Sequence, residues 1–122
     1  MGLTGYVHDL FADSVISAGV PATATLKLSE STGVISGHLV ADGAVTVTFK
    51  VRNTTADVVP DFVAPLGLSG EQLSSVMSLD AAGEKAAVLQ LPAFEEYEFT
   101  AATASEEDVT VSFLLYTDNK GV

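Results

Sequence analysis

Residues 44–53 read AVTVTFKVRN, and this stretch decides how the rest of the chain must fold. Successive side chains of an extended strand point to opposite faces, so its apolar and polar residues would separate onto two sides. The apolar set is Val45, Val47, Phe49 and Val51, and the polar set is Thr46, Thr48, Lys50 and Arg52. The alternation predicts a half-buried strand whose apolar side needs a second layer to cover it.

Length and composition point to one domain with one core. The chain has 122 residues, of which 48% are hydrophobic and 17% charged, and it has no cysteine. A chain of this length buries enough surface to fold without disulfide or thiolate-metal crosslinks. We expect one β-sandwich domain over residues 23–122. Residues 1–22 fit a helical and an extended pattern equally, and we expect them to form either an N-terminal arm or an edge strand.

The charge balance limits the partners of the chain. Five Lys and Arg against 16 Asp and Glu give a formal net charge of −11. Such a chain repels phosphate backbones and anionic lipids, so we expect no nucleic-acid and no membrane partner. The N-terminus lacks the basic region of a signal peptide. We therefore expect a protein made without a leader, or one whose leader has been removed.

Further strands are expected on both sides of the opening stretch. Residues 23–52 predict a three-stranded meander, in which Asp42-Gly43 is typical of a tight hairpin turn. Alternating runs also occupy residues 87–91, 97–101 and 109–116. Seven or eight strands at spacings near ten residues predict an all-β fold, an antiparallel two-sheet sandwich that is either immunoglobulin-like or jelly-roll-like.

One short helix is expected near residues 70–77. Ser69 would cap it, with Gln72 three residues later as its capping-box partner and Leu68 packing against Leu73. The inward side of this helix would be Leu73, Val76 and Met77. It would connect the two sheets or cross one end of the sandwich.

No motif in the sequence predicts catalysis. Ser69 does not complete the G-x-S-x-G pattern of hydrolases, because Glu71 takes the place of the last glycine. No glycine-rich phosphate loop is present, and His8 and His38 lack the spacing of metal ligands. We therefore expect no catalytic residue, no cofactor, no metal and no enzymatic activity.

Carboxylates are the abundant polar resource of the chain. They form the clusters Glu95, Glu96 and Glu98, then Glu106, Glu107 and Asp108, with Asp57 and Asp61 near the proline-containing stretch. Calcium accepts such oxygens, but the D-x-D-x-D spacing of a calcium loop is missing. A solvated acidic surface and a calcium site both remain open.

Two apolar stretches are candidate protein interfaces. Pro60 and Pro65 remove ladder donors, so residues 58–63 are excluded from a central strand and either close one end of the core or bind a partner. The N-terminal segment is the second candidate. The candidate interface residues are Leu3, Tyr6, Val7, Leu10, Phe11, Val58, Val59, Phe62 and Val63.

The runs VTVTFKVRNTT, AAGEKAAVLQLPAFEEYEFTAAT and DVTVSFLLYT resemble immunoglobulin-like sandwich modules. The cysteine pair and core tryptophan of antibody-type domains are missing, so only the architecture carries over. The Ala/Val/Thr-rich, acidic, cysteine-free residues 23–117 also resemble head-decoration and tail-decoration proteins of tailed-phage virions. This resemblance implies a virion protein that binds a capsid shell or tail tube.

These observations favour a non-enzymatic structural protein of a virion that acts through protein–protein contacts and forms homo-oligomers. The alternative is a carbohydrate- or calcium-dependent binding module from a larger extracellular or cell-surface protein. A calcium-dependent shift of the melting temperature would separate the second hypothesis from the first.

Overall fold

The computed structural model describes residues 6–27, 35–53, 58–73, 75–89 and 94–117, which form eight β-strands and no helix. The strands are β1 (Tyr6–Ile16), β2 (Ala22–Lys27), β3 (Ile35–Ala41), β4 (Val45–Arg52), β5 (Ser75–Leu79), β6 (Gly83–Leu89), β7 (Glu96–Ala102) and β8 (Val109–Thr117). Within these ranges, accordingly, there is no helix long and apolar enough to span a bilayer.

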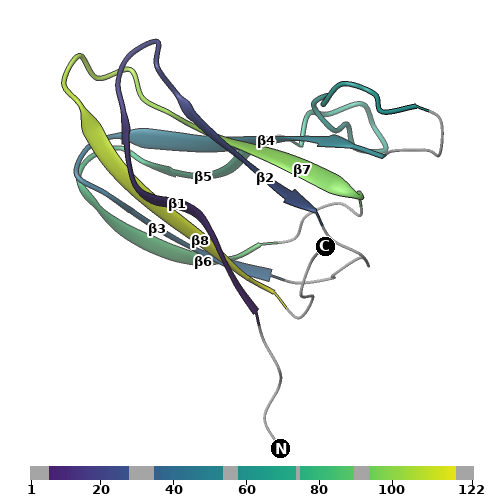
Figure 1. The fold of residues 1–122 in the computed structure, drawn as a ribbon, viewed down its shortest axis with the longest axis horizontal. Helices are drawn as coiled ribbons and strands as arrows, with labels where there is room; N and C mark the ends of the chain where they lie inside the picture. Colours follow the sequence, from purple (N-terminus) through teal and green to yellow (C-terminus); the bar gives the residue numbers. More distant parts are fainter. Residues whose placement is uncertain (1–5, 28–34, 54–57, 74, 90–93, 118–122) are drawn as a thin grey trace, which may run out of the picture.

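The strands form two four-stranded antiparallel sheets that pack face to face (Figure 1). One sheet has the order β1-β8-β3-β6 and the other has the order β2-β7-β4-β5. Only β4 and β5 are paired neighbours that are also consecutive in the sequence. Eight strands in two such sheets make a jelly roll, so the predicted antiparallel sandwich is confirmed in its jelly-roll form. An immunoglobulin domain places its first two strands in one sheet, and here β1 and β2 lie in different sheets.

The predicted meander over residues 23–52 is wrong. β3 pairs with β6 and β8, whereas β4 pairs with β5 and β7 in the opposite sheet. The Asp42-Gly43 turn therefore carries the chain from one sheet to the other. Asp42 is held to the start of β8, because its Oδ1 accepts a hydrogen bond from Thr110 N at 2.7 Å.

The predicted helix near residues 70–77 is also wrong. Residues from Ser75 onward form β5, which pairs with β4 through Val45↔Leu79 and Val47↔Met77. A helix of two turns is marginal by itself, whereas a strand here satisfies the free edge of β4. Before β5, Gly70 adopts a φ of 83°, the left-handed conformation of a tight turn.

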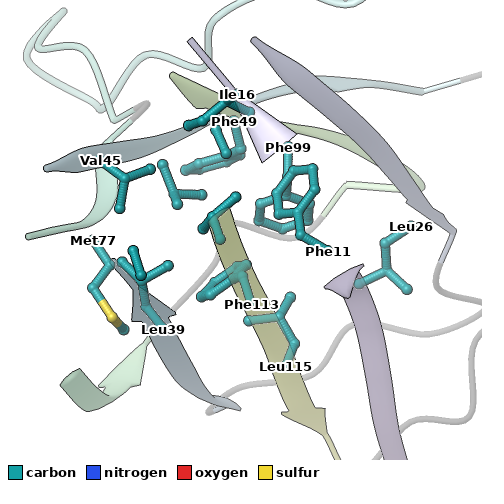
Figure 2. Packing of buried hydrophobic residues seen from close by; sticks show 14 of the residues in the cluster. Phe11, Ile16, Leu26, Leu39, Val45, Phe49, Met77, Phe99, Phe113 and Leu115 are labelled. Carbon is teal, nitrogen blue, oxygen red and sulfur yellow. The ribbon is translucent and has the colours of Figure 1, made fainter. Parts of the chain in front are cut away.

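The core lies between the sheets and is built around Phe99 (Figure 2). Its ring centroid lies 6.0 Å from that of Phe49 and 6.2 Å from those of Tyr97 and Phe113. The contact with Phe113 joins β7 of one sheet to β8 of the other. Fully burying a large apolar side chain contributes about 1.5–3 kcal/mol, so this cluster is a main source of stability. The strand predicted from residues 44–53 supplies Val45, Val47, Phe49 and Val51 to the same core.

Candidate functional site

The connection between β4 and β5 projects beyond one end of the sandwich (Figure 1). Residues 58–73 of this connection are ordered by backbone hydrogen bonds. Val51 N donates to Val63 O at 2.8 Å, and Val63 N donates back to Val51 O at 3.0 Å. Leu73 N donates to Pro65 O at 3.0 Å. The segment is therefore a structured projection, and we call residues 58–73 the projecting loop.

Arg52, at the end of β4, anchors the projecting loop to the sandwich. Its guanidinium carbon lies 4.1 Å from the centroid of the Phe62 ring. Its Nε donates to Glu96 Oε2 at 2.6 Å, and its Nη1 donates to Pro60 O at 3.4 Å. The Arg52 and Glu96 side chains are 24% and 16% exposed. One partly buried cation thus connects β4, β7 and the loop.

The projecting loop exposes aliphatic side chains. Its exposed large hydrophobic residues are Val58, Val59, Val63, Leu66, Leu68 and Leu73. Among them, Leu68 at the tip is fully exposed, and Gly70 supplies the turn. Glu71 folds back, since its Oε2 accepts a hydrogen bond from Ser69 N at 3.1 Å. These exposed aliphatic groups on one ordered segment make the projecting loop the candidate interaction surface of the chain.

Of the predicted interface residues, the loop therefore holds Val58, Val59 and Val63 at its surface, while Phe62 is half-buried under Arg52. Leu66 and Leu68 belong to the same surface and were not predicted. The sequence did contain a signal for their exposure. The two leucines stand between Pro65 and Gly70 and do not belong to an alternating strand pattern. The capping pattern at Ser69 instead led us to expect Leu68 to pack against Leu73, just before a helix.

The candidate interface residues of the N-terminal segment differ in exposure. Tyr6 is the first residue of β1 and pairs in register with Thr117 of β8. Val7 is 57% exposed, Leu10 packs partly against the core, and Phe11 is 3% exposed within the core. The Phe11 side chain is therefore packed inside this chain. Leu3 lies outside the described residues.

β1 lies at the edge of its sheet and is interrupted twice. Its register with β8 shifts between Asp9 and Phe11, and again between Phe11 and Ser14. Asp13 adopts a φ of 50°, unusual for a non-glycine residue. Beside these bulges lies a hollow of about 240 Å³. It is lined by Asp9, Phe11, Ala12, Asp13, His38, Val40, Ser112, Phe113 and Leu114.

The polar groups of the hollow are arranged in pairs. Ser112 Oγ accepts a hydrogen bond from Asp13 N at 2.9 Å and donates to Asp13 Oδ1 at 3.2 Å. His38 lies on the outer face of β3, and its Nε2 is 2.9 Å from Glu84 Oε2. Ser112 is thus hydrogen-bonded to an aspartate, and no described contact joins it to the histidine that nucleophilic activation requires.

The carboxylate clusters serve different roles. Glu96 pairs with Arg52, and Glu95 Oε1 lies 3.7 Å from Lys27 Nζ. Glu98 lies beside Lys50 in the register of β4 and β7. Glu106, Glu107 and Asp108 are exposed in the turn before β8, Asp61 is exposed in the projecting loop, and Asp57 lies outside the described residues. In the described part of the chain, no three histidine or carboxylate groups come together to hold a metal ion.

Known proteins resemble this chain in fold and not in sequence. No protein-family model matches the sequence, and no curated protein matches it. A crystal structure of tripeptidyl peptidase 2 is similar with a TM-score of 0.60 and 10% identity, over 91% of this chain and 10% of that one. The infectious bursal disease virus Gx strain structure has a TM-score of 0.52 and 13% identity, over 97% of this chain and 32% of that one.

A CBM36-1 domain of a multidomain xylanase from the hindgut metagenome of Trinervitermes trinervoides has a TM-score of 0.49 and 5% identity. That comparison covers 93% of this chain and 96% of the other. The chain thus spans about a tenth and about a third of the peptidase and virus chains. At these identities the similarity shows the fold alone.

Proposed function

We propose that this chain is a non-enzymatic structural protein that acts through protein–protein contacts, as a decoration or minor structural component of a virion shell or tube. The observation that carries the proposal is the projecting loop, which presents aliphatic side chains at one end of the sandwich. Burying these side chains against another surface would lower the free energy, because it would remove apolar area from water. A neighbouring copy or a shell protein would supply that surface.

The anchoring of the loop makes it suited to binding. Arg52, the Val51–Val63 bridge and the Leu73–Pro65 hydrogen bond hold the loop before any partner arrives. Binding by a preorganised segment loses less conformational entropy than binding by a free one. The formal charge of −11 opposes close approach of copies elsewhere, which favours association through the aliphatic side chains of the loop.

Three observations support the virion setting. The jelly roll is an architecture that viral capsid domains use, and residues 23–117 have the composition described above for phage decoration proteins. The similarity to the infectious bursal disease virus structure adds support at the level of the fold.

The second candidate is a carbohydrate- or calcium-dependent binding module of a cell-surface or extracellular protein. The observation that favours it is the hollow beside β1, where Asp9 and Asp13 lie near exposed apolar groups. A glycan array with and without calcium tests this candidate. Glycan binding that is lost on Asp13→Asn would support it, and a blank array would refute it.

Sedimentation velocity tests the first proposal. We expect the wild-type chain to self-associate as its concentration rises from micromolar to near millimolar. The double variant Val59→Ser, Leu68→Ser should remain monomeric. Val20→Ser, which changes an exposed valine in the turn before β2, is the matched control and should behave as the wild type. A wild-type chain that stays monomeric throughout would overturn the association of copies through the projecting loop.

A further inference from the structure

The two outer faces of the sandwich differ in chemistry. Outside the β2-β7-β4-β5 sheet, paired residues form polar rows across the strands. These rows are Lys27, Glu96 and Arg52, then Thr25, Glu98 and Lys50, then Thr23, Thr100 and Thr48. Alternating charges and threonines are what a sheet face exposed to water requires.

The outer face of the β1-β8-β3-β6 sheet is apolar by comparison. One row crosses all four strands through the pairs Val7↔Tyr116, Tyr116↔Ser36 and Ser36↔Val88. Val7, Tyr116 and Val88 are 57%, 46% and 74% exposed. The neighbouring rows add Leu114, Ala86 and Val40. We call Val7, Val40, Ala86, Val88, Leu114 and Tyr116 the apolar sheet face.

The charges on and around the apolar sheet face have one sign. Its carboxylates are Asp9, Asp13 and Glu84, with His38 beside Glu84. The lysines and arginine of the described residues lie elsewhere. Three of them are on the opposite face, and Lys85 Nζ donates to Ser78 O of β5 at 2.9 Å. This face therefore combines exposed apolar area with carboxylates that have no lysine or arginine beside them among the described residues.

We infer that the apolar sheet face docks a second protein that presents aliphatic side chains flanked by lysine or arginine. The inference rests on the proposed function, which requires a protein partner, and it adds the chemistry of that partner. Charge complementarity selects a basic partner. Two copies stacked through this face would bring carboxylates together without a lysine or arginine between them, and desolvating unpaired charges is costly.

The hollow beside β1 offers both an apolar wall and a carboxylate to a lysine or arginine side chain of the partner. Val40, Phe113 and Leu114 line it with apolar surface, and Asp9 lies among the lining residues. No hydrogen-bond or ion-pair partner of the Asp9 carboxylate occurs among the residues that the structure describes. A lysine or arginine would lay its methylene groups on Val40 and Leu114 and bring its charged end to Asp9.

A peptide titration tests the inference. The probe is a synthetic peptide of alternating lysine and valine, and the comparison peptide replaces each lysine by glutamate. We expect the wild-type chain to bind the lysine peptide at least about tenfold more tightly, a difference that shrinks as salt is added. Asp9→Asn and Val88→Thr should each weaken binding about three- to tenfold.

Glu98→Gln is the matched control, because it removes one negative charge from the opposite face. It should leave binding unchanged, as should Val59→Ser combined with Leu68→Ser in the projecting loop. Equal weakening by Glu98→Gln and Asp9→Asn would overturn the inference, since net charge alone would explain the binding. A wild-type dimer that dissociates on Val88→Thr would also overturn it, because the occupant would then be a second copy. Either result leaves the sedimentation test of the loop intact.

Discussion

The guanidinium of Arg52 lies over the ring of Phe62, with 4.1 Å between the guanidinium carbon and the ring centroid. The same group pairs with Glu96 of β7 through a 2.6 Å hydrogen bond. A single side chain therefore ties the exposed loop to two neighbouring strands. The loop can present aliphatic surface to a partner because its base is fixed in this way.

Replacing Arg52 by alanine should release the projecting loop. Loss of the ring contact and of the ion pair is expected to lower the free energy of unfolding by about 1–3 kcal/mol. Amide exchange of Val63 should accelerate, because its N–H bonds to Val51 O at the base of the loop. Lys50→Ala on the same strand face is the control. An unchanged Val63 exchange rate would show that Arg52 does not hold the loop.

Gly37 of β3 is expected to accept a larger residue only at a cost in stability. A Cβ at this position would lie 3.0 Å from Leu89 Cδ1, 3.1 Å from Phe113 Cε1 and 3.3 Å from Met77 Cε. Gly37→Ala should lower the free energy of unfolding by about 1–3 kcal/mol, measured by urea titration. Gly83→Ala is the matched control, because a Cβ there meets no heavy atom within 4 Å. Equal stability of the two variants would contradict the packing described for Gly37.

Phe99 is expected to be the most sensitive position of the core. It is fully buried and contacts three other aromatic rings across both sheets. Phe99→Ala should lower the free energy of unfolding by about 3–5 kcal/mol through lost burial and an unfilled cavity. The exposed Val88→Ala should change it by less than about 0.5 kcal/mol. A fully folded, equally stable Phe99→Ala protein would refute this arrangement of the core.

Tyr97 should make the chain less stable in alkali. Burial raises the pKa of Tyr97 above its ordinary value of 10.0, while the hydrogen bond from Phe94 N to its hydroxyl partly opposes this rise. The folded state thus holds the proton more tightly than the unfolded state. The stabilising effect of the Tyr97 proton is complete below pH 10 and is lost as the pH rises through the pKa of Tyr97 in the folded state. Tyr97→Phe should flatten this decline in thermal melts. An equally steep decline in the variant would exclude Tyr97 as its cause.

Local pattern predicted the strands better than their partners. The alternation of Val45, Val47, Phe49 and Val51 was sufficient for β4, because a strand with one buried face must alternate. The pairing of β3 with β8 joins residues that are about 70 to 80 positions apart in the sequence, and no local signal reports it. Asp42-Gly43 resembles a hairpin turn by composition, but the bonds of Asp42 to Thr110 make it a crossing between sheets.

The candidate surfaces likewise divide into one that the local sequence predicted and one that only the assembled sheets reveal. Proline placement led to Val58, Val59 and Val63, because Pro60 and Pro65 exclude a central strand whatever the fold. The apolar sheet face was not predicted, since Val7, Tyr116 and Val88 meet only after β1, β8, β3 and β6 are assembled. The prediction of a helix near residues 70–77 is wrong because the local capping pattern competes with the unpaired edge of β4, and Ser75–Leu79 pair with that edge instead.

The assembly state of the chain in its source tests the central claim most directly. Particles would be separated on a density gradient and viewed by electron microscopy with gold-labelled antibodies against this chain. We expect gold on regularly spaced sites of a shell or tube, with few copies free. Copies found only as free monomers, with no labelled particle in any fraction, would contradict it.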